Sequence, residues 1–151
     1  MKVGDKAPLF NGLNEKGEEV SLSDFVGKKL VIYFYPKDDT PGCTAESCNL
    51  RDNYSEFKKE GYEIIGISAD TSAKHEKFIN KYNLPFPLIA DTEKEIIKAF
   101  GVWGEKKFMG KVYDGILRTT FVLDESHTIT HIIDKVKTKA HSEQIFELIT
   151  N

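Results

Sequence analysis

Two cysteines five residues apart carry the most reactive side-chain chemistry in this sequence. Cys43 and Cys48 lie in the segment 36–48, in which Thr-Pro-Gly directly precedes the first cysteine. Thr40 is a favourable helix N-cap and Pro41 suits the first helical position, so a helix is predicted to begin there. Cys43 then lies in the first turn, where unpaired N–H groups favour a thiolate over a thiol. A thiolate is the species that attacks a peroxide, and the product is a sulfenic acid.

The spacing of the two cysteines predicts a conformational change if they form a disulfide. Five residues of α-helix rise about 7.5 Å and turn by about 500°, which places the two Cα atoms roughly 8 to 9 Å apart. A disulfide tolerates a Cα separation of about 4.4–6.8 Å. We therefore hypothesise that Cys43 and Cys48 can pair only when the first turns of the helix unwind. A disulfide between them in an undistorted helix would refute this hypothesis.

The residues alone leave other interpretations of the cysteines open. A buried cysteine is often an inert apolar side chain, which fits Cys48 better than Cys43, because Cys43 follows a polar loop. A C-x4-C pair could be half of a zinc site, but zinc needs four ligands and the sequence has only two cysteines. We expect no metal, and we expect the four histidines at the surface or beside the site. A cysteine–histidine hydrolase remains an alternative, although no sequence feature places a histidine beside Cys43.

Length and composition favour an ordinary globular protein. The 151 residues suit one domain, residues 1–151, with 40% hydrophobic and 30% charged residues. A net charge of -3 argues against a nucleic-acid partner. The chain has no apolar run of about 20 residues that would span a membrane, and its first residues show no secretory signal. We therefore expect a cytoplasmic protein, in which such a close cysteine pair is more often redox-active, catalytic or metal-binding than structural.

Strand and helix patterns alternate along the chain and must position the cysteines. Buried strands are predicted at 30–35, 62–69 and 88–90, with hairpins at 9–22 and 118–136. Helices are predicted at 41–59, 72–82 and 140–150, and an extra helix runs from a capping box at Thr92 to Gly101. This order predicts an α/β fold with a central mixed β-sheet flanked by helices. Ligand sites in such sheets lie at the carboxyl ends of strands, where residues 36–43 are expected.

The segment 34–48 resembles the active-site segment of the peroxiredoxins, which has the form P-x-x-x-T-x-x-C. The fuller string is similar to the subfamily called bacterioferritin comigratory protein, or peroxiredoxin Q. Residues 3–10, 81–88 and 115–124 also resemble that subfamily, so the similarity covers essentially the whole chain. The resemblance implies a thioredoxin-like fold with an N-terminal extension, here the 9–22 hairpin.

The resemblance also implies an antioxidant activity, the reduction of hydrogen peroxide and organic hydroperoxides. Cys43 is implied to be the peroxidatic cysteine and Cys48 the resolving cysteine, which form a disulfide within one chain. Thioredoxin or a similar dithiol protein is the implied reductant, and no metal, flavin or haem cofactor is implied. An intrachain disulfide allows a monomer, which we expect. An alternative on the same fold is a non-peroxidase thiol–disulfide exchange or chaperone-like protein, but the C-x-x-C signature of such proteins is missing.

Four further residues take roles from the resemblance. Thr40 is implied to bind the peroxide through its hydroxyl group, and Pro36 to shield the pocket from water. Arg118 is implied to stand beside the sulfur and to hold the thiolate and the peroxide oxygens. Glu46 is implied to orient that network. Without the resemblance, Arg118 would be interpreted as an ordinary solvated arginine.

Overall fold

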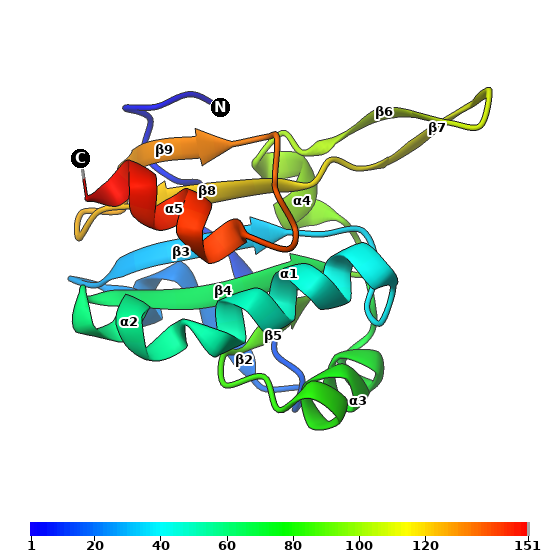
Figure 1. Cartoon of the computed structure of the whole chain (residues 1–151). Helices are drawn as coiled ribbons and strands as arrows, with labels where there is room; N and C mark the ends of the chain where they lie inside the picture. Colours follow the sequence, from blue (N-terminus) through cyan, green and yellow to red (C-terminus); the bar gives the residue numbers. More distant parts are fainter. Residues whose placement is uncertain (151) are drawn as a thin grey trace.

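Strand β3 (Lys29–Phe34) runs through the middle of a sheet and leads directly into the cysteine-containing segment (Figure 1). The computed structural model describes residues 1–150. Within this range seven strands form one sheet, with β3 parallel to β4 and antiparallel to β8. In spatial order they are β2 (Glu19–Ser21), β1 (Asn11–Leu13), β5 (Leu88–Ala90), β4 (Tyr62–Ser68), β3, β8 (Thr119–Leu123) and β9 (Ile129–Ile133). The predicted mixed sheet and N-terminal hairpin are confirmed.

The side chains of β3 alternate between two apolar layers, because successive residues of a strand point to opposite faces. Ile32 and Phe34 join the cluster beneath the 3₁₀ helix η1 (Leu22–Phe25) and α4 (Glu95–Ala99). Tyr33 joins the cluster on the other face. Four helices contribute to that second cluster: α1 (Pro41–Asp52), α2 (Tyr54–Lys59), α3 (Ser72–Tyr82) and α5 (His141–Ile149). Burial on both faces explains the continuous apolar sequence of β3.

The single helix predicted for residues 41–59 is wrong, because the structure has two helices that meet at Asn53. The side-chain Nδ2 of Asn53 donates to the carbonyl oxygen of Asn49 at 2.9 Å. In a continuous helix that carbonyl would accept from the backbone N–H of Asn53, which instead bonds to Leu50 at 3.3 Å. A side chain that competes with the helical backbone in this way breaks the helix.

The predicted capping box at Thr92 is also wrong. Helix α4 starts only at Glu95, after Lys94, which has a φ of 63°. The side chain of Asp91 does the capping instead, since its Oδ2 accepts from the backbone N–H of Ile97 at 2.7 Å. Gly101 follows the helix with a φ of 72°, which agrees with the predicted end.

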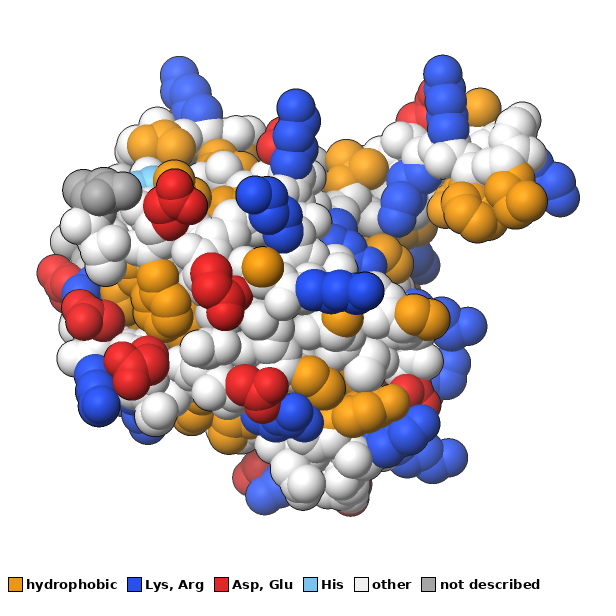
Figure 2. Space-filling model, viewed as in Figure 1, with side chains coloured by type: hydrophobic (Ala, Val, Ile, Leu, Met, Phe, Trp, Pro, Cys, Tyr) orange, Lys and Arg blue, Asp and Glu red, His pale blue; other side chains and the backbone are white. Residues whose placement is uncertain are grey.

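A two-stranded hairpin that the sequence patterns did not predict projects from the body of the molecule (Figure 1). It consists of β6 (Trp103–Phe108) and β7 (Lys111–Ile116). Figure 2 shows lysine and hydrophobic side chains together on its surface. Its position matters for the site, because the chain leaves β7 only two residues before Arg118. Within residues 1–150, no helix is long and apolar enough to cross a membrane.

Gly66 of β4 allows a close approach between the sheet and the ring of Tyr33. A Cβ atom at Gly66 would lie 2.8 Å from Cζ of Tyr33 and 2.6 Å from Cδ2 of Leu88. The hydroxyl of Tyr33 is 2.9 Å from the Ser47 hydroxyl on α1. The missing side chain at residue 66 thus lets a buried tyrosine hold α1 in place over the sheet.

Candidate active site

Cys43 lies at the junction of β3 and α1, in the first turn of the helix that Thr40 and Pro41 begin. Its side chain is only 1% exposed and belongs to the apolar cluster of the second face. Despite this burial, its Sγ accepts a hydrogen bond from Nη2 of Arg118 at 3.2 Å. The sulfur therefore lies at the start of a helix and within hydrogen-bond distance of a permanent positive charge.

The guanidinium of Arg118 donates hydrogen bonds to both the sulfur of Cys43 and the buried carboxyl group of Glu46. Its Nη1 donates to Oε1 of Glu46 at 2.7 Å, while Nη2 faces Cys43. Cys43 and Glu46 are three residues apart on α1, so they share one face of the helix. Gly42 leaves room for the guanidinium, because a Cβ there would lie 3.3 Å from Nη2. Burial opposes the positive charge of Arg118, but the negative charges of Cys43 and Glu46 outweigh it and raise the pKa of the guanidinium.

Glu46 is fully buried, and its second oxygen is poorly satisfied. Oε2 has no hydrogen-bond partner in the described part of the chain, and Nε2 of His141 lies 3.5 Å from it. Burial raises the pKa of Glu46 to about 7, against the opposing effect of Arg118. Glu46 therefore lies between a cation and an imidazole, and its own charge depends on pH near neutrality.

His141 lies behind Glu46 because α5 is docked onto α1. Asn49 of α1 accepts from the backbone N–H of Ser142 at 2.6 Å. The ring of His141 is fully buried, with Nε2 2.7 Å from the hydroxyl of Thr120 and Nδ1 3.0 Å from Oε1 of Gln144. Burial lowers the pKa of His141 to about 4, and Arg118 also contributes to lowering it.

The pH dependence of stability should separate Glu46 from His141. The folded state binds the Glu46 proton more tightly than the unfolded state, so this stabilisation is lost as the pH rises from about 4.5 to 7. The folded state binds the His141 proton less tightly than the unfolded state does. The contribution of His141 to the unfolding free energy therefore grows as the pH rises from about 4 to 6.5. The two nearly cancel in the parent protein.

In Glu46→Gln only the histidine contribution is left. Between about pH 4 and pH 7, its unfolding free energy should rise by about 3 kcal/mol more than that of the parent. Urea unfolding at a series of pH values measures this difference. Parallel curves for the two proteins would contradict it.

Thr40 and Pro36 lie in the segment that leads from β3 to Cys43. The hydroxyl of Thr40 donates to the carbonyl oxygen of Lys37 at 2.8 Å and makes no capping hydrogen bond to α1. Its own proton is thus engaged, and its oxygen lone pairs remain able to accept a hydrogen bond. Pro36 directly follows the buried Tyr35 and is itself half-buried.

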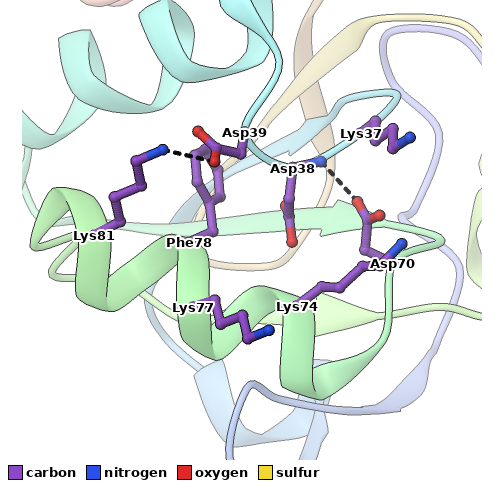
Figure 3. Close-up of a pocket in the computed structure, with 8 residues that line it drawn as sticks. All are labelled: Lys37, Asp38, Asp39, Asp70, Lys74, Lys77, Phe78 and Lys81. Carbon is purple, nitrogen blue, oxygen red and sulfur yellow. Dashed lines mark hydrogen bonds and ion pairs between the residues drawn. The ribbon is translucent and has the colours of Figure 1, made fainter.

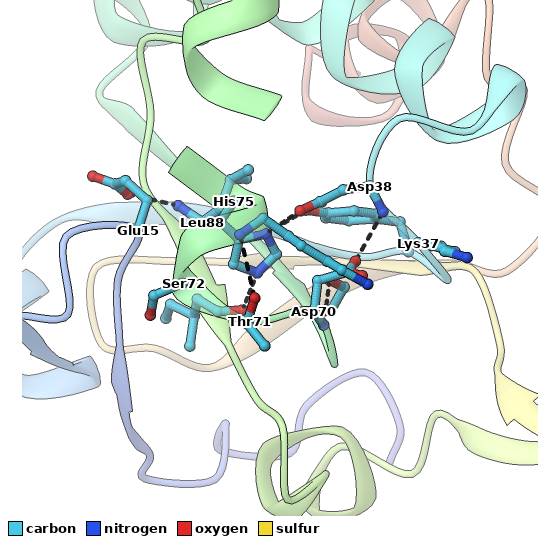
Figure 4. A network of polar contacts seen from close by, with 12 residues as sticks. Glu15, Lys37, Asp38, Asp70, Thr71, Ser72, His75 and Leu88 are labelled. Atoms are coloured by element: carbon cyan, nitrogen blue, oxygen red, sulfur yellow. Dashed lines mark hydrogen bonds and ion pairs between the residues drawn. The ribbon is translucent and has the colours of Figure 1, made fainter. Parts of the chain in front are cut away.

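The loop before Cys43 is anchored by a network that sequence reasoning missed (Figure 4). Asp38 accepts from the hydroxyl of Tyr35 and lies 2.6 Å from Nδ1 of His75. The backbone N–H of Asp38 donates to Asp70 at 2.8 Å, and Nε2 of His75 faces the carbonyl oxygen of Ile89 at 3.0 Å. His75 is fully buried, so of the two predicted placements of the histidines, at the surface or beside the site, the surface one is wrong for His75. No pattern in the sequence links these residues, because the fold alone brings them together.

Asp38, Asp70 and His75 are close enough to hold a metal ion, with ligand atoms within 4.8 Å of one another. Both ring nitrogens of His75 already face hydrogen-bond acceptors. A metal would have to displace one of these contacts, so the arrangement fits a proton between Asp38 and His75 better than a metal ion.

An open cavity of about 400 Å³ adjoins the same loop (Figure 3). The residues that line it are Lys37, Asp38, Asp39, Asp70, Lys74, Lys77, Phe78 and Lys81. Asp39 is paired there with Lys81 at 2.8 Å. Cys43 does not line this cavity, so the cavity and the sulfur are separate features of one end of the molecule.

Cys48 lies further along the intact helix α1 and is half-buried. Burial raises the pKa of its thiol, while Arg51 lowers it in part. Both cysteines are free thiols. The structure thus shows the reduced arrangement, in which the helix separates the two sulfurs.

Comparison with known proteins decides the family, because residues 3–132 match the AhpC/TSA family. The chain belongs to this family. The peroxiredoxin Bcp of Escherichia coli is 46% identical over 145 residues, which cover 96% of this chain and 93% of that protein. The peroxiredoxin Bcp of Bacillus subtilis is 44% identical over 149 residues, which cover 99% of this chain and 95% of that protein.

Solved structures of this family share the fold. A Cys-to-Ser mutant of PrxQ from Xylella fastidiosa superposes with a TM-score of 0.92 at 30% identity and covers 99% of this chain and 96% of that one. A mutant of peroxiredoxin Q from Xanthomonas campestris gives 0.87 at 35% identity, with coverage of 93% and 90%. The predicted thioredoxin-like fold is confirmed. This peroxiredoxin is a thiol-dependent peroxidase, as the resemblance of its cysteine segment implied.

Proposed function

We propose that Cys43 is the residue that attacks the peroxide. The single observation that carries this proposal is the 3.2 Å contact between its sulfur and Arg118 at the start of a helix. The thiolate attacks one peroxide oxygen, the O–O bond breaks, and Cys43 becomes a sulfenic acid while the leaving oxygen takes a proton. Negative charge develops on that leaving oxygen, and fixed N–H donors stabilise it.

Thr40 and Pro36 complete the proposed peroxide site. Because the Thr40 hydroxyl already donates to Lys37, its oxygen is oriented to accept the O–H of a hydroperoxide. Pro36 adds apolar surface at the mouth of the site, which keeps water from competing for the same donors. A hydroperoxide, either hydrogen peroxide or an organic one, fits this set of one acceptor and several donors.

The second half of the proposed cycle is a disulfide between Cys43 and Cys48, reduced by thioredoxin or a similar dithiol protein. Both cysteines lie on one helix, so α1 must unwind at its start before the sulfurs can meet. The Asp38 network holds the preceding loop, which confines the unwinding to the helix. We further propose a cytoplasmic, single-domain monomer, because both cysteines belong to one chain and thiol reductants maintain such a cycle in the cytoplasm.

Cys48→Ser should separate the two halves of the cycle. The first oxidation of Cys43 should keep its rate within about twofold, because residue 48 does not contact the sulfur–arginine pair. Steady-state turnover with thioredoxin should fall at least about 100-fold, since the sulfenic acid has no partner thiol. Stopped-flow oxidation and a coupled thioredoxin assay measure the two steps. Normal turnover of the variant would contradict a resolving role for Cys48.

A further inference from the structure

The protonation of the His141 ring can be derived from its neighbours. Gln144 is fixed in orientation, because its Oε1 accepts from the backbone N–H of Lys137 at 3.0 Å and its Nε2 donates to the carbonyl of Lys135 at 2.8 Å. The Gln144 oxygen therefore faces Nδ1 of His141, and Nδ1 must carry a hydrogen to donate to it. In a neutral ring, Nε2 is then a lone-pair acceptor, which the Thr120 hydroxyl satisfies.

This arrangement leaves a place for one proton between the histidine and Glu46. As a carboxylate, Glu46 presents the buried Oε2 to a lone pair of Nε2 at 3.5 Å, with no donor between them among residues 1–150. A buried polar atom without a partner is costly. One proton removes this conflict: on Oε2 it neutralises the buried carboxylate, and on Nε2 it makes the ring a cation 3.5 Å from that carboxylate. The Thr120 hydroxyl can donate or accept, so it can keep its contact with Nε2 in either state.

Charge balance links this proton to the reaction. Before oxidation, the buried site holds the negative Cys43, the positive Arg118 and the protonated pair, so its net charge is zero. Oxidation turns Cys43 into a neutral sulfenic acid, and Arg118 then keeps only Glu46 as a counter-charge. Loss of the pair's proton restores neutrality, and a buried site strongly favours neutrality.

We propose that Glu46 and His141 together hold one proton behind Arg118, and that the pair releases it when Cys43 is oxidised. The inference rests on the proposed role of Cys43. The balanced step is Cys43–S⁻ + ROOH + H⁺ → Cys43–SOH + ROH, in which sulfur loses two electrons to the peroxide and the leaving oxygen gains the proton. The released proton offsets the one that this step consumes, so His141 is a positioning residue that acts through Glu46.

Other titratable groups face this pair and must be considered. Tyr33 of β3 stays neutral, because burial, and to a smaller extent Glu46, raise its pKa well above its usual value. Lys106 of β6 has its pKa lowered by burial and by Arg118. Cys43 and Arg118 complete the set. Of this set, Glu46 is the group that Arg118 contacts directly besides Cys43 itself.

Proton uptake during oxidation tests this proposal directly. The parent protein in this experiment is the full chain with Cys48→Ser, because its reaction stops at the sulfenic acid. It is mixed with one equivalent of hydrogen peroxide and a pH indicator. Ultraviolet absorbance gives the thiolate fraction of Cys43, and trapping with mass spectrometry gives the sulfenic acid formed. At about pH 6 the parent should take up less than about half a proton per thiolate oxidised, and at about pH 8.5 about one.

Two variants and one control sharpen the result. Glu46→Gln should take up about one proton at about pH 6, because the carboxyl that holds the proton is gone. Independently, His141→Gln should take up more than the parent, because one of the two atoms that share the proton is gone. His131→Gln, on β9 and away from Glu46, should behave as the parent. Uptake of about one proton by the parent at about pH 6, or equal uptake by the parent and both variants, would overturn the inference. Absence of any Cys43 oxidation in the parent would overturn the proposed function as well.

Discussion

Cys43→Ser should lose at least about 10⁴-fold in kcat/KM for hydrogen peroxide. A serine hydroxyl is not ionised at neutral pH, and neither the helix start nor Arg118 can make it a comparable nucleophile. The substitution changes one buried atom in a side chain that is 1% exposed, so the fold should be kept. Peroxide consumption with a thioredoxin system measures the loss.

Cys48→Ser is the matched control for this experiment. It makes the same sulfur-to-oxygen change on the same helix, yet it should retain one peroxide-dependent oxidation per chain. Peroxidase activity of Cys43→Ser close to that of the unmodified protein would contradict the assignment of Cys43. Equal loss of the first oxidation in both serine variants would also contradict it.

Arg118→Gln should lower the rate of Cys43 oxidation by about 10²- to 10³-fold, because it removes the charge that holds the thiolate and stabilises the leaving oxygen. It also leaves Glu46 buried without its cation, so the unfolding free energy should fall by about 2–4 kcal/mol. Arg118→Lys should recover part of the oxidation rate, because it keeps the positive charge, but a lysine cannot bond to Cys43 and Glu46 with the fixed geometry of a guanidinium. Stopped-flow oxidation and urea unfolding measure the two effects.

The double variant Arg118→Gln/Glu46→Gln separates stability from chemistry. It should recover most of the lost stability, because no unpaired carboxylate remains, but it should not recover the rate. The other arginine of the chain, Arg51, bonds to the carbonyl of Tyr82 and serves as the control. Arg51→Gln should change the rate of Cys43 oxidation by less than about twofold. A slow oxidation step in Arg51→Gln, or a fast one in Arg118→Gln, would contradict the account.

Strong local patterns made the parts of the fold around Cys43 predictable. The apolar run of β3 and the Thr-Pro-Gly start of α1 gave the strand, the loop and the helix in the right order. The β6–β7 hairpin was missed because it is largely exposed and polar, so it has no periodic burial to detect. The break at Asn53 was missed because it depends on one side-chain hydrogen bond to a backbone carbonyl.

The arrangement around the sulfur was less accessible to sequence reasoning. Arg118 is 75 residues from Cys43 along the chain, and only the family resemblance pointed to it. The histidines were expected at the surface or beside the site, and tertiary packing buries both His141 and His75 next to it, which the sequence did not specify. Spacing cannot report contacts between segments this far apart. The burial of Cys43 itself also depends on packing by α5 and β3 rather than on its own polar segment.

The central claim, that peroxide oxidises Cys43 and that Cys48 then closes a disulfide, is tested most directly by one titration. The reduced protein is mixed with increasing amounts of hydrogen peroxide, free thiols are counted, and disulfides are mapped by mass spectrometry. One equivalent of peroxide should remove both thiols of each chain and yield a peptide pair joined through residues 43 and 48 of the same chain. Unreacted thiols after several equivalents of peroxide, or a disulfide found only between chains, would contradict it.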